Sequence, residues 1–165
     1  MRASKPAPAV PGLRACEVVD GELRLILGGR LAAIEDGRLA ILRFLGPQAL
    51  DPLVINRLEV VFEEIVSNIV RHGLTPGSDQ SIAVRVTPRP DAIGLVIEDD
   101  GIPFNPLEAP PPLPFSALGT APLGGLGIAL TRKLAAEIRY EAPSPAPGAA
   151  SWPKNRLILS IATAA

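Results

Sequence analysis

Hydrophobic and polar positions repeat along this chain with two different periods, and each period predicts one kind of secondary structure. Apolar side chains at every second position predict five strands, at residues 22–28, 82–87, 93–99, 138–141 and 155–161. Apolar side chains three and four positions apart predict three helices, at residues 31–45, 52–73 and 126–138. The order of these elements predicts an α/β (α+β) domain with one mixed, mainly antiparallel sheet and helices on one of its faces.

Two proline-rich segments interrupt this pattern. Residues 1–17 are predicted to be a flexible Pro/Ala-rich tail, which leaves residues 18–165 as a single domain. Residues 102–123 contain seven prolines and are therefore incompatible with a helix or a central strand. Because a structureless span of this length inside a domain is usually functional, we interpret it as a lid.

Composition and charge exclude some classes of function. Hydrophobic residues make up 47% of the 165 residues but aromatic residues only 4%, so the core must be built from aliphatic side chains. The net charge of −1 lacks the basic excess that nucleic-acid or anionic-membrane partners require. Cys16 is the only cysteine, which fits a reducing compartment, and no apolar run reaches membrane-spanning length. We expect a cytoplasmic protein that binds neither nucleic acid nor membrane.

The predicted central helix carries a polar flank beside its apolar stripe. Asp51 is a suitable N-cap for this helix, and Glu64, Asn68 and His72 then recur at every fourth position. A glutamate can accept a proton from an attacking hydroxyl, and an amide oxygen suits Mg²⁺, which takes few protein ligands beside substrate phosphates. Taken alone, such a pair is more often part of a solvated helix face.

Two further segments add chemistry to this helix. Asp99 continues the apolar face of its strand, so its buried carboxylate should meet a hydrogen-bond donor. Gly125–Gly127 starts a helix, where free backbone N–H groups and the helix dipole can hold phosphate. Each segment alone is more often an ordinary turn, but together with Glu64 and Asn68 they suit an adenine nucleotide. Asp99 would accept the exocyclic amine of adenine, and the lid would cover the nucleotide.

The motifs in this order resemble those of the GHKL ATPases. LEVVFEEIVSNIVRHG is similar to their N-box, IEDDGIPFNPL to their first glycine box, GGLGIALTRKLAAEIRYE to their second, and NRLILSI to their closing strand. Within that group the chain most resembles the anti-sigma-factor serine kinases, over residues 22–161. The resemblance implies a Bergerat-type two-layer sandwich, a histidine-kinase-like ATP-binding domain over residues 18–165, and the cofactors ATP and Mg²⁺.

The resemblance also implies roles for individual residues. Glu64 would be the general base and Asn68 the Mg²⁺ ligand. Asp99 would contact adenine, Gly101 would place its backbone beside the base, and Gly125 and Gly127 would cradle phosphate. The residues expected to bind the cofactor are Asn68, His72, Asp99, Gly101, Pro103, Gly125, Leu126 and Gly127. His72 could contact the lid or a phosphate, although a histidine at a helix end more commonly caps carbonyl groups.

The function implied is that of a protein serine/threonine kinase acting as an anti-sigma factor. It would phosphorylate a STAS-type antagonist and alternately capture a sigma factor, and the family makes a homodimer through the first strand and helix an expectation. Glu108 is the only charged residue between Asn105 and Thr131, so the lid brings no cation to the γ-phosphate. This favours a second hypothesis, a nucleotide-gated binding module with little turnover. A detached histidine-kinase catalytic domain is a third, although no phospho-acceptor histidine segment precedes the sheet.

Phosphoryl transfer needs positive charge at the γ-phosphate, and the cation-poor lid does not supply it. The candidates for neutralising the γ-phosphate are Arg71, His72, Arg132 and Lys133.

Overall fold

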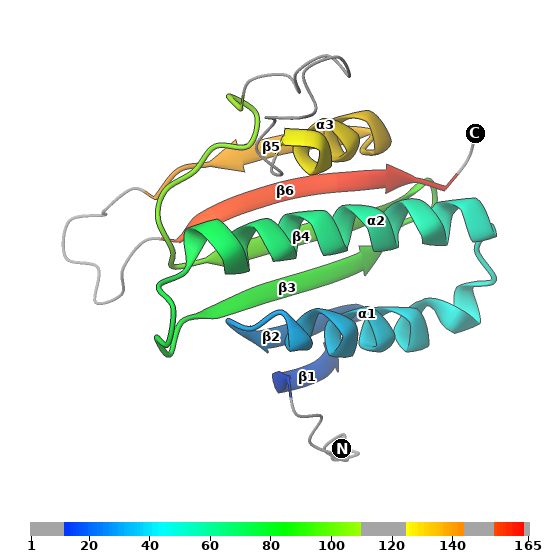
Figure 1. Ribbon diagram of the computed structural model, residues 1–165. Helices are drawn as coiled ribbons and strands as arrows, with labels where there is room; N and C mark the ends of the chain where they lie inside the picture. The colour runs from blue at the N-terminus through cyan, green and yellow to red at the C-terminus, as the bar shows by residue number, and fades with distance from the viewer. Residues whose placement is uncertain (1–11, 110–124, 144–153, 164–165) are drawn as a thin grey trace.

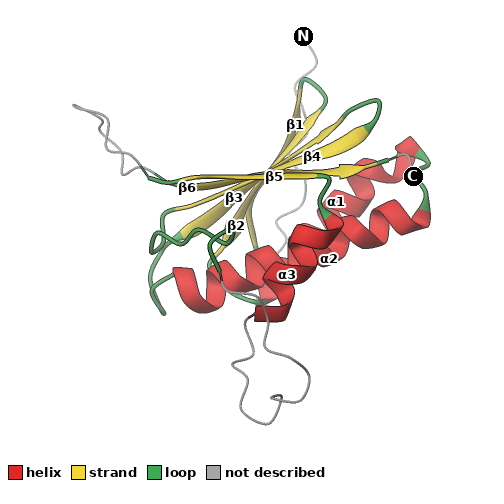
Figure 2. Cartoon of the chain, turned by 90° about the horizontal axis from the view of Figure 1, so that it is seen from above, coloured by secondary structure: helices red, strands yellow, loops and turns green. Residues whose placement is uncertain are grey.

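The structure is a computed structural model that describes residues 12–109, 125–143 and 154–163. Within these residues six strands form one open sheet, and three α-helices cover a single face of it (Figures 1 and 2). The strands are β1 (Leu13–Val19), β2 (Glu22–Gly28), β3 (Ser81–Pro88), β4 (Ala92–Asp99), β5 (Glu137–Glu141) and β6 (Asn155–Ala162). The helices are α1 (Ala32–Leu45), α2 (Pro52–Asn68) and α3 (Gly125–Leu134). This two-layer α/β sandwich confirms the predicted fold class.

The sheet order is β1-β2-β3-β4-β6-β5, and every pairing between described strands is antiparallel. The expectation of a mixed sheet therefore needs correction. The crossover through α3 does bring β5 back in the same direction as β4, since both run antiparallel to β6. However, β6 inserts between them, so the two parallel strands are never neighbours.

The core lies between the helices and the apolar face of the sheet. Alternate side chains of the four central strands point toward α2, which meets them with Leu58, Val61, Phe62 and Ile65. Each fully buried side chain of this kind contributes about 1.5–3 kcal/mol by leaving water. Gly37 lies in the middle of α1 because a Cβ there would lie 2.8 Å from the ring of Phe62. The close approach of α1 and α2 explains a glycine that helix propensity disfavours.

The first strand is a correction to the predicted tail. Residues 13–17 belong to β1, which pairs with β2 across a two-residue turn formed by Asp20 and Gly21, both with positive φ. The strand was missed because its pairing shifts register between Leu13 and Ala15, which breaks the two-residue alternation. Residues 1–11 of the predicted tail lie outside the described residues.

The third helix is shorter than predicted. It was expected to reach residue 138 but ends at Leu134, and Ile138 lies in β5 opposite Leu159, within the strand predicted at 138–141. The backbone N–H of Ala136 already bonds the carbonyl of Ser160, so the chain has joined the sheet by that point. Leu130, which the helical spacing of residues 126–138 placed among the apolar contacts of this helix, is 36% exposed. None of the helices in the described part of the chain is long and apolar enough to cross a membrane.

Candidate functional site

A cavity of about 430 Å³ lies where the end of α2, the adjoining ends of β4 and β6, and the segment after β4 come together. This volume is typical of small-molecule and cofactor sites. The walls are mainly apolar and include Ile65, Ile97, Phe104 and Leu157. A site of this kind gains affinity from burying a flat apolar ligand, and its few polar groups then decide which ligand fits.

The structure brings some of the predicted site residues together and leaves others apart. Those that line the cavity are Asn68, His72, Asp99 and Pro103. Gly101 packs against Asp99, and Glu64 lies against Gly127 where α2 and α3 meet. Gly125 is the first residue of α3. Leu126 is 72% exposed and does not line the cavity. The predicted lid is described only up to residue 109, and its remainder, residues 110–123, lies outside the described residues.

Asp99 is held at the end of β4 by two donors. It is 5% exposed, and its Oδ1 accepts hydrogen bonds from the Gly101 N–H at 2.9 Å and from Asn155 Nδ2 at 3.0 Å. The expectation that this carboxylate meets a donor is therefore confirmed. Burial raises the pKa of Asp99, while the bonds from Asn155 and Gly101 oppose that rise. Both bonds end on Oδ1, and no described donor occupies Oδ2.

Asn155 and Tyr140 complete this arrangement, and neither was predicted from the sequence. Asn155 lies directly opposite Asp99 in the β4–β6 pairing and is 5% exposed. Its Nδ2 donates to Asp99 and lies 3.3 Å and 3.2 Å from the carbonyls of Gly101 and Ile102. The Tyr140 hydroxyl donates to Asn155 Oδ1 at 2.7 Å, which fixes the orientation of the amide. Burial, followed by the charge of Asp99, raises the pKa of Tyr140.

The loop after β4 is tied to the end of α2 through backbone contacts. The N–H of Ile102 donates to the carbonyl of Gly73 at 2.9 Å. A Cβ at Gly101 would lie 2.5 Å from that carbonyl oxygen and 2.8 Å from Asp99 Oδ1, closer than real Cβ atoms come. Glycine at position 101 is therefore required for the close approach of this loop to Gly73 and Asp99, and its predicted place beside the base stays a prediction.

The end of the central helix differs from a regular α-helix. Asp51 caps its start through a 2.7 Å bond from the Leu53 N–H, as predicted, but Ile69–Gly73 is a π-helical turn. A π turn takes more residues per turn than an α-helix, so the step from Asn68 to His72 is not that of the regular helix on which the prediction was based. His72 is exposed yet still lines the cavity. The Nδ2 of Asn68 is buried without a hydrogen-bond partner among the described residues.

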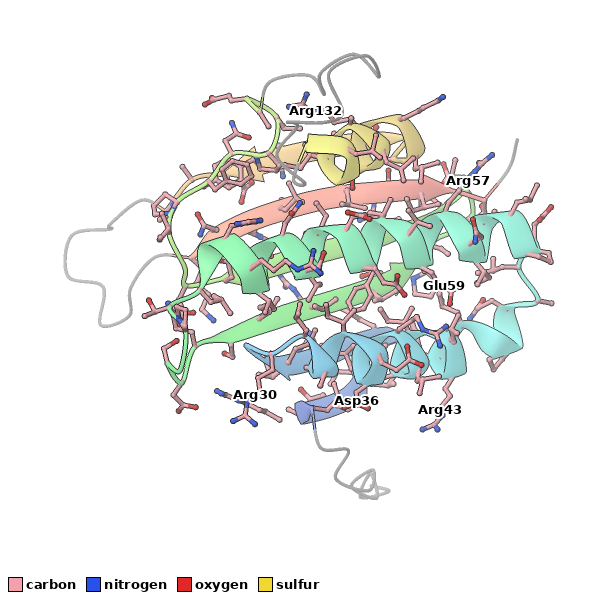
Figure 3. All side chains as sticks on the ribbon, in the orientation of Figure 1. Arg30, Asp36, Arg43, Arg57, Glu59 and Arg132 are labelled. Atoms are coloured by element: carbon pink, nitrogen blue, oxygen red, sulfur yellow. The ribbon has the colours of Figure 1, made fainter. Side chains whose placement is uncertain are left out.

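The cations near the site are placed as follows. Arg132, labelled on α3 in Figure 3, donates to the carbonyls of Pro106 and Ala109, the latter at 3.1 Å. It therefore holds the segment after β4 that forms a wall of the cavity. Arg71 and Lys133 are exposed. Of the two cations in the last turn of α3, Arg132 thus bonds the wall of the cavity.

A metal ion at this site would depend on few protein ligands. Among the described residues, no group of three or more His, Cys, Asp or Glu side chains is placed to hold a metal ion. The amide of Asn68 fits Mg²⁺, because it lines the cavity and no described residue bonds its Nδ2 and holds it in another orientation. The donor set therefore suits a hard cation that keeps water and nucleotide phosphates as its other ligands.

Comparisons with known proteins agree with this geometry. A relative from Bordetella bronchiseptica, named serine/threonine-protein kinase BtrW, is 30% identical over 84 residues. The alignment covers 51% of this chain and 59% of that protein, so the chain matches less than two thirds of its relative. A family model described as a histidine kinase-like ATPase domain matches residues 29–151, most of the chain. The chain therefore belongs to the histidine kinase-like ATPase domain family, which implies that it binds ATP.

Proposed function

We propose that the chain is an ATP-dependent protein serine/threonine kinase that acts as an anti-sigma factor. It would phosphorylate a STAS-type antagonist and, when not engaged in this transfer, capture a sigma factor. The family match and the kinase name of the relative support this proposal. The observation that carries it is the cavity, which joins an amine-accepting carboxylate at Asp99 to a metal-suited amide at Asn68, one helical turn from Glu64.

Each part of the site would serve one part of the transfer. Asp99 accepts the exocyclic amine of adenine, and the apolar walls bury the ring. The first turn of α3 holds phosphate through backbone N–H groups. Asn68 is the protein ligand for Mg²⁺, which, when bound, neutralises charge on the β- and γ-phosphates.

The transfer itself needs a base and a hydroxyl. The serine oxygen of the antagonist forms a bond to the γ-phosphorus as the bond to the β-phosphate oxygen breaks, and ADP leaves. Glu64 takes the proton of the serine hydroxyl. Serine phosphate and ADP are then the two products, and the protonated Glu64 returns its proton to water.

The decisive experiment is a transfer assay with γ-labelled ATP, Mg²⁺ and a purified STAS-domain protein. We expect acid-stable label on a serine of the acceptor, and we expect Glu64→Ala to lower its rate of formation by about 100- to 10,000-fold. Acid-labile label on this chain would instead indicate histidine kinase chemistry. No label, or label undiminished in Glu64→Ala, would refute the kinase proposal.

The second candidate function is a nucleotide-gated binding module. One specific observation favours it: Arg132 is engaged by the carbonyls of Pro106 and Ala109, in a region where Glu108 is the only charged residue between Asn105 and Thr131. Slow or absent transfer would follow if Arg132 keeps these bonds and does not reach the γ-phosphate. Calorimetry that shows ATP binding, combined with no release of phosphate, would support this function over the kinase.

A further inference from the structure

The helices α2 and α3 meet at one unusually close contact, between Glu64 and Gly127. A Cβ placed on Gly127 would lie 2.7 Å from Glu64 Cδ, and Glu64 Oε2 would be closer still. Real Cβ atoms essentially never approach another heavy atom within 3.0 Å. The Glu64 carboxylate therefore occupies the space that any side chain at position 127 would need.

The backbone conformation of Gly127 does not account for this glycine. Gly127 does not have the positive φ that would demand glycine, in contrast to Gly21 and Gly77. Within a helix, glycine is less favourable than alanine. The three atoms nearest to the hypothetical Cβ all belong to Glu64, and the third of these is already 3.4 Å away. Without the Glu64 side chain, alanine at position 127 would meet only ordinary van der Waals contacts.

We propose that Gly127 is a positioning residue for Glu64, in addition to any role that it has in phosphate binding. The missing side chain leaves space on the first turns of α3, and the flexible side chain of Glu64 occupies it. We call this space at Gly127 the seat. A carboxylate so close to the start of a helix is also favoured by the helix dipole. This inference deepens the proposed function and rests on it, because Glu64 is the base of that function.

The seat connects two parts of the site that lie far apart in the sequence. Glu64 comes from the central helix, whereas Gly127 comes from the glycine-rich segment that would hold phosphate. If α3 shifts when phosphate binds, the support of the base shifts with it. Substitution at position 127 should therefore act on the chemical step through Glu64.

The first test needs no nucleotide. The melting temperature of the apo protein is measured for Gly127→Ala in the wild-type, Glu64→Ala and Glu64→Gln backgrounds. In Glu64→Ala the added methyl group should raise the melting temperature, as alanine does at an unobstructed helix position. In the wild-type and Glu64→Gln backgrounds the gain should be smaller or reversed, because a side chain of full length must leave the seat.

A matched control is Gly46→Ala, since a Cβ at Gly46 would meet nothing within 4 Å. Its effect should be the same in all three backgrounds. Equal shifts for Gly127→Ala in all three backgrounds, or a Glu64→Gln result that matches Glu64→Ala, would overturn the seat. This outcome does not depend on whether the protein is a kinase.

The second test uses transfer kinetics. Gly127→Ala should lower kcat and leave the KM for ATP nearly unchanged, and it should have no further effect in Glu64→Ala. An equal rise in KM in both backgrounds, with kcat unchanged, would assign Gly127 to phosphate binding alone and overturn the proposal. If the wild type transfers no phosphate, the proposed function fails, and the melting experiment still decides on the seat.

Discussion

The two ends of the cavity are built in different ways. At the strand end, Asp99, Asn155 and Tyr140 form a chain of hydrogen bonds in which each member has a described partner. At the helix end, Asn68 has a buried Nδ2 without a described partner, and the Glu64 carboxylate lies against Gly127. The strand end is organised before any ligand arrives, whereas the helix end has polar groups that still need one.

The difference follows from the elements that carry each end. Neighbouring strands fix their side chains in register, so Asp99 and Asn155 face each other by the geometry of the sheet. The helix end depends on the packing of α2 and α3 and on a π turn, a feature frequent at functional sites. We infer that the strand end determines which base binds, and that the helix end determines whether chemistry follows.

The largest expected effect separates the two ends directly. Glu64→Ala should lower phosphate transfer by about 100- to 10,000-fold, the usual contribution of a general base. Nucleotide affinity should change little, because the strand end remains intact. Transfer is measured with γ-labelled ATP and affinity by calorimetry with ADP. A comparable loss in both quantities would show that the two ends are not separable.

The second-largest expected effect is a loss of nucleotide affinity at the strand end. Asp99→Asn should weaken ATP binding by roughly 10- to 100-fold, because a charge-assisted hydrogen bond contributes about 1.5–3 kcal/mol. The asparagine Oδ1 can still accept from Gly101 and Asn155, so the fold should persist. Calorimetry with ATP measures the loss, and GTP serves as the comparison. Equal affinities of the variant and the wild type for ATP would exclude Asp99 from adenine recognition.

The same variant has a pH signature. The pKa of Asp99 is raised in the folded state, so its ionisation opposes folding. The contribution of the protonated form to stability is complete below the ordinary aspartate pKa of about 4 and is lost as the pH rises through the folded-state pKa. Asp99→Asn should therefore be more stable than the wild type at neutral pH, and this advantage should vanish in acid. Denaturant melts across this pH range test the sign.

Of the strand end, only Asp99 was predicted from the sequence, and the two omissions have physical reasons. The alternation of Ile93, Leu95 and Ile97 places Asp99 on the core face without any knowledge of the fold. The same step backward from Leu157 places position 155 on that face. Its pairing with Asp99, however, depends on β6 inserting beside β4, which no local pattern records.

Other features differ in how far the sequence could have revealed them. The Asp20-Gly21 dipeptide is a strong hairpin signal, and it would have indicated β1 despite the break in alternation. The π turn has no comparable signature in the sequence. The bonds from Arg132 to the wall join residues more than twenty positions apart, and the seat at Gly127 depends on how two helices pack. These contacts arise from tertiary packing, so they required the structure.

A third prediction tests whether the strand end acts as a unit. Asn155→Ala removes one donor from Asp99 and the acceptor of Tyr140, so the free energy of unfolding should fall by roughly 1–3 kcal/mol. ATP affinity should fall as well, because the carboxylate loses its fixed orientation. Ser160→Ala on the same strand is the matched control, since no described hydrogen bond involves its side chain. Equal losses in the two variants would indicate a general effect on β6.

The smallest effect is expected at the far end of the network. Tyr140→Phe keeps the aromatic wall but removes the donor to Asn155, so it should cost about 0.5–1.5 kcal/mol of stability. Tyr140 is the only tyrosine in the chain, so phenolate absorbance in the wild type reports its titration alone. Burial and the charge of Asp99 both raise its pKa, so Asp99→Asn should move the titration toward lower pH. An unchanged titration in Asp99→Asn would mean that the two side chains are not coupled, and Asn155 would then orient Asp99 without the help of Tyr140.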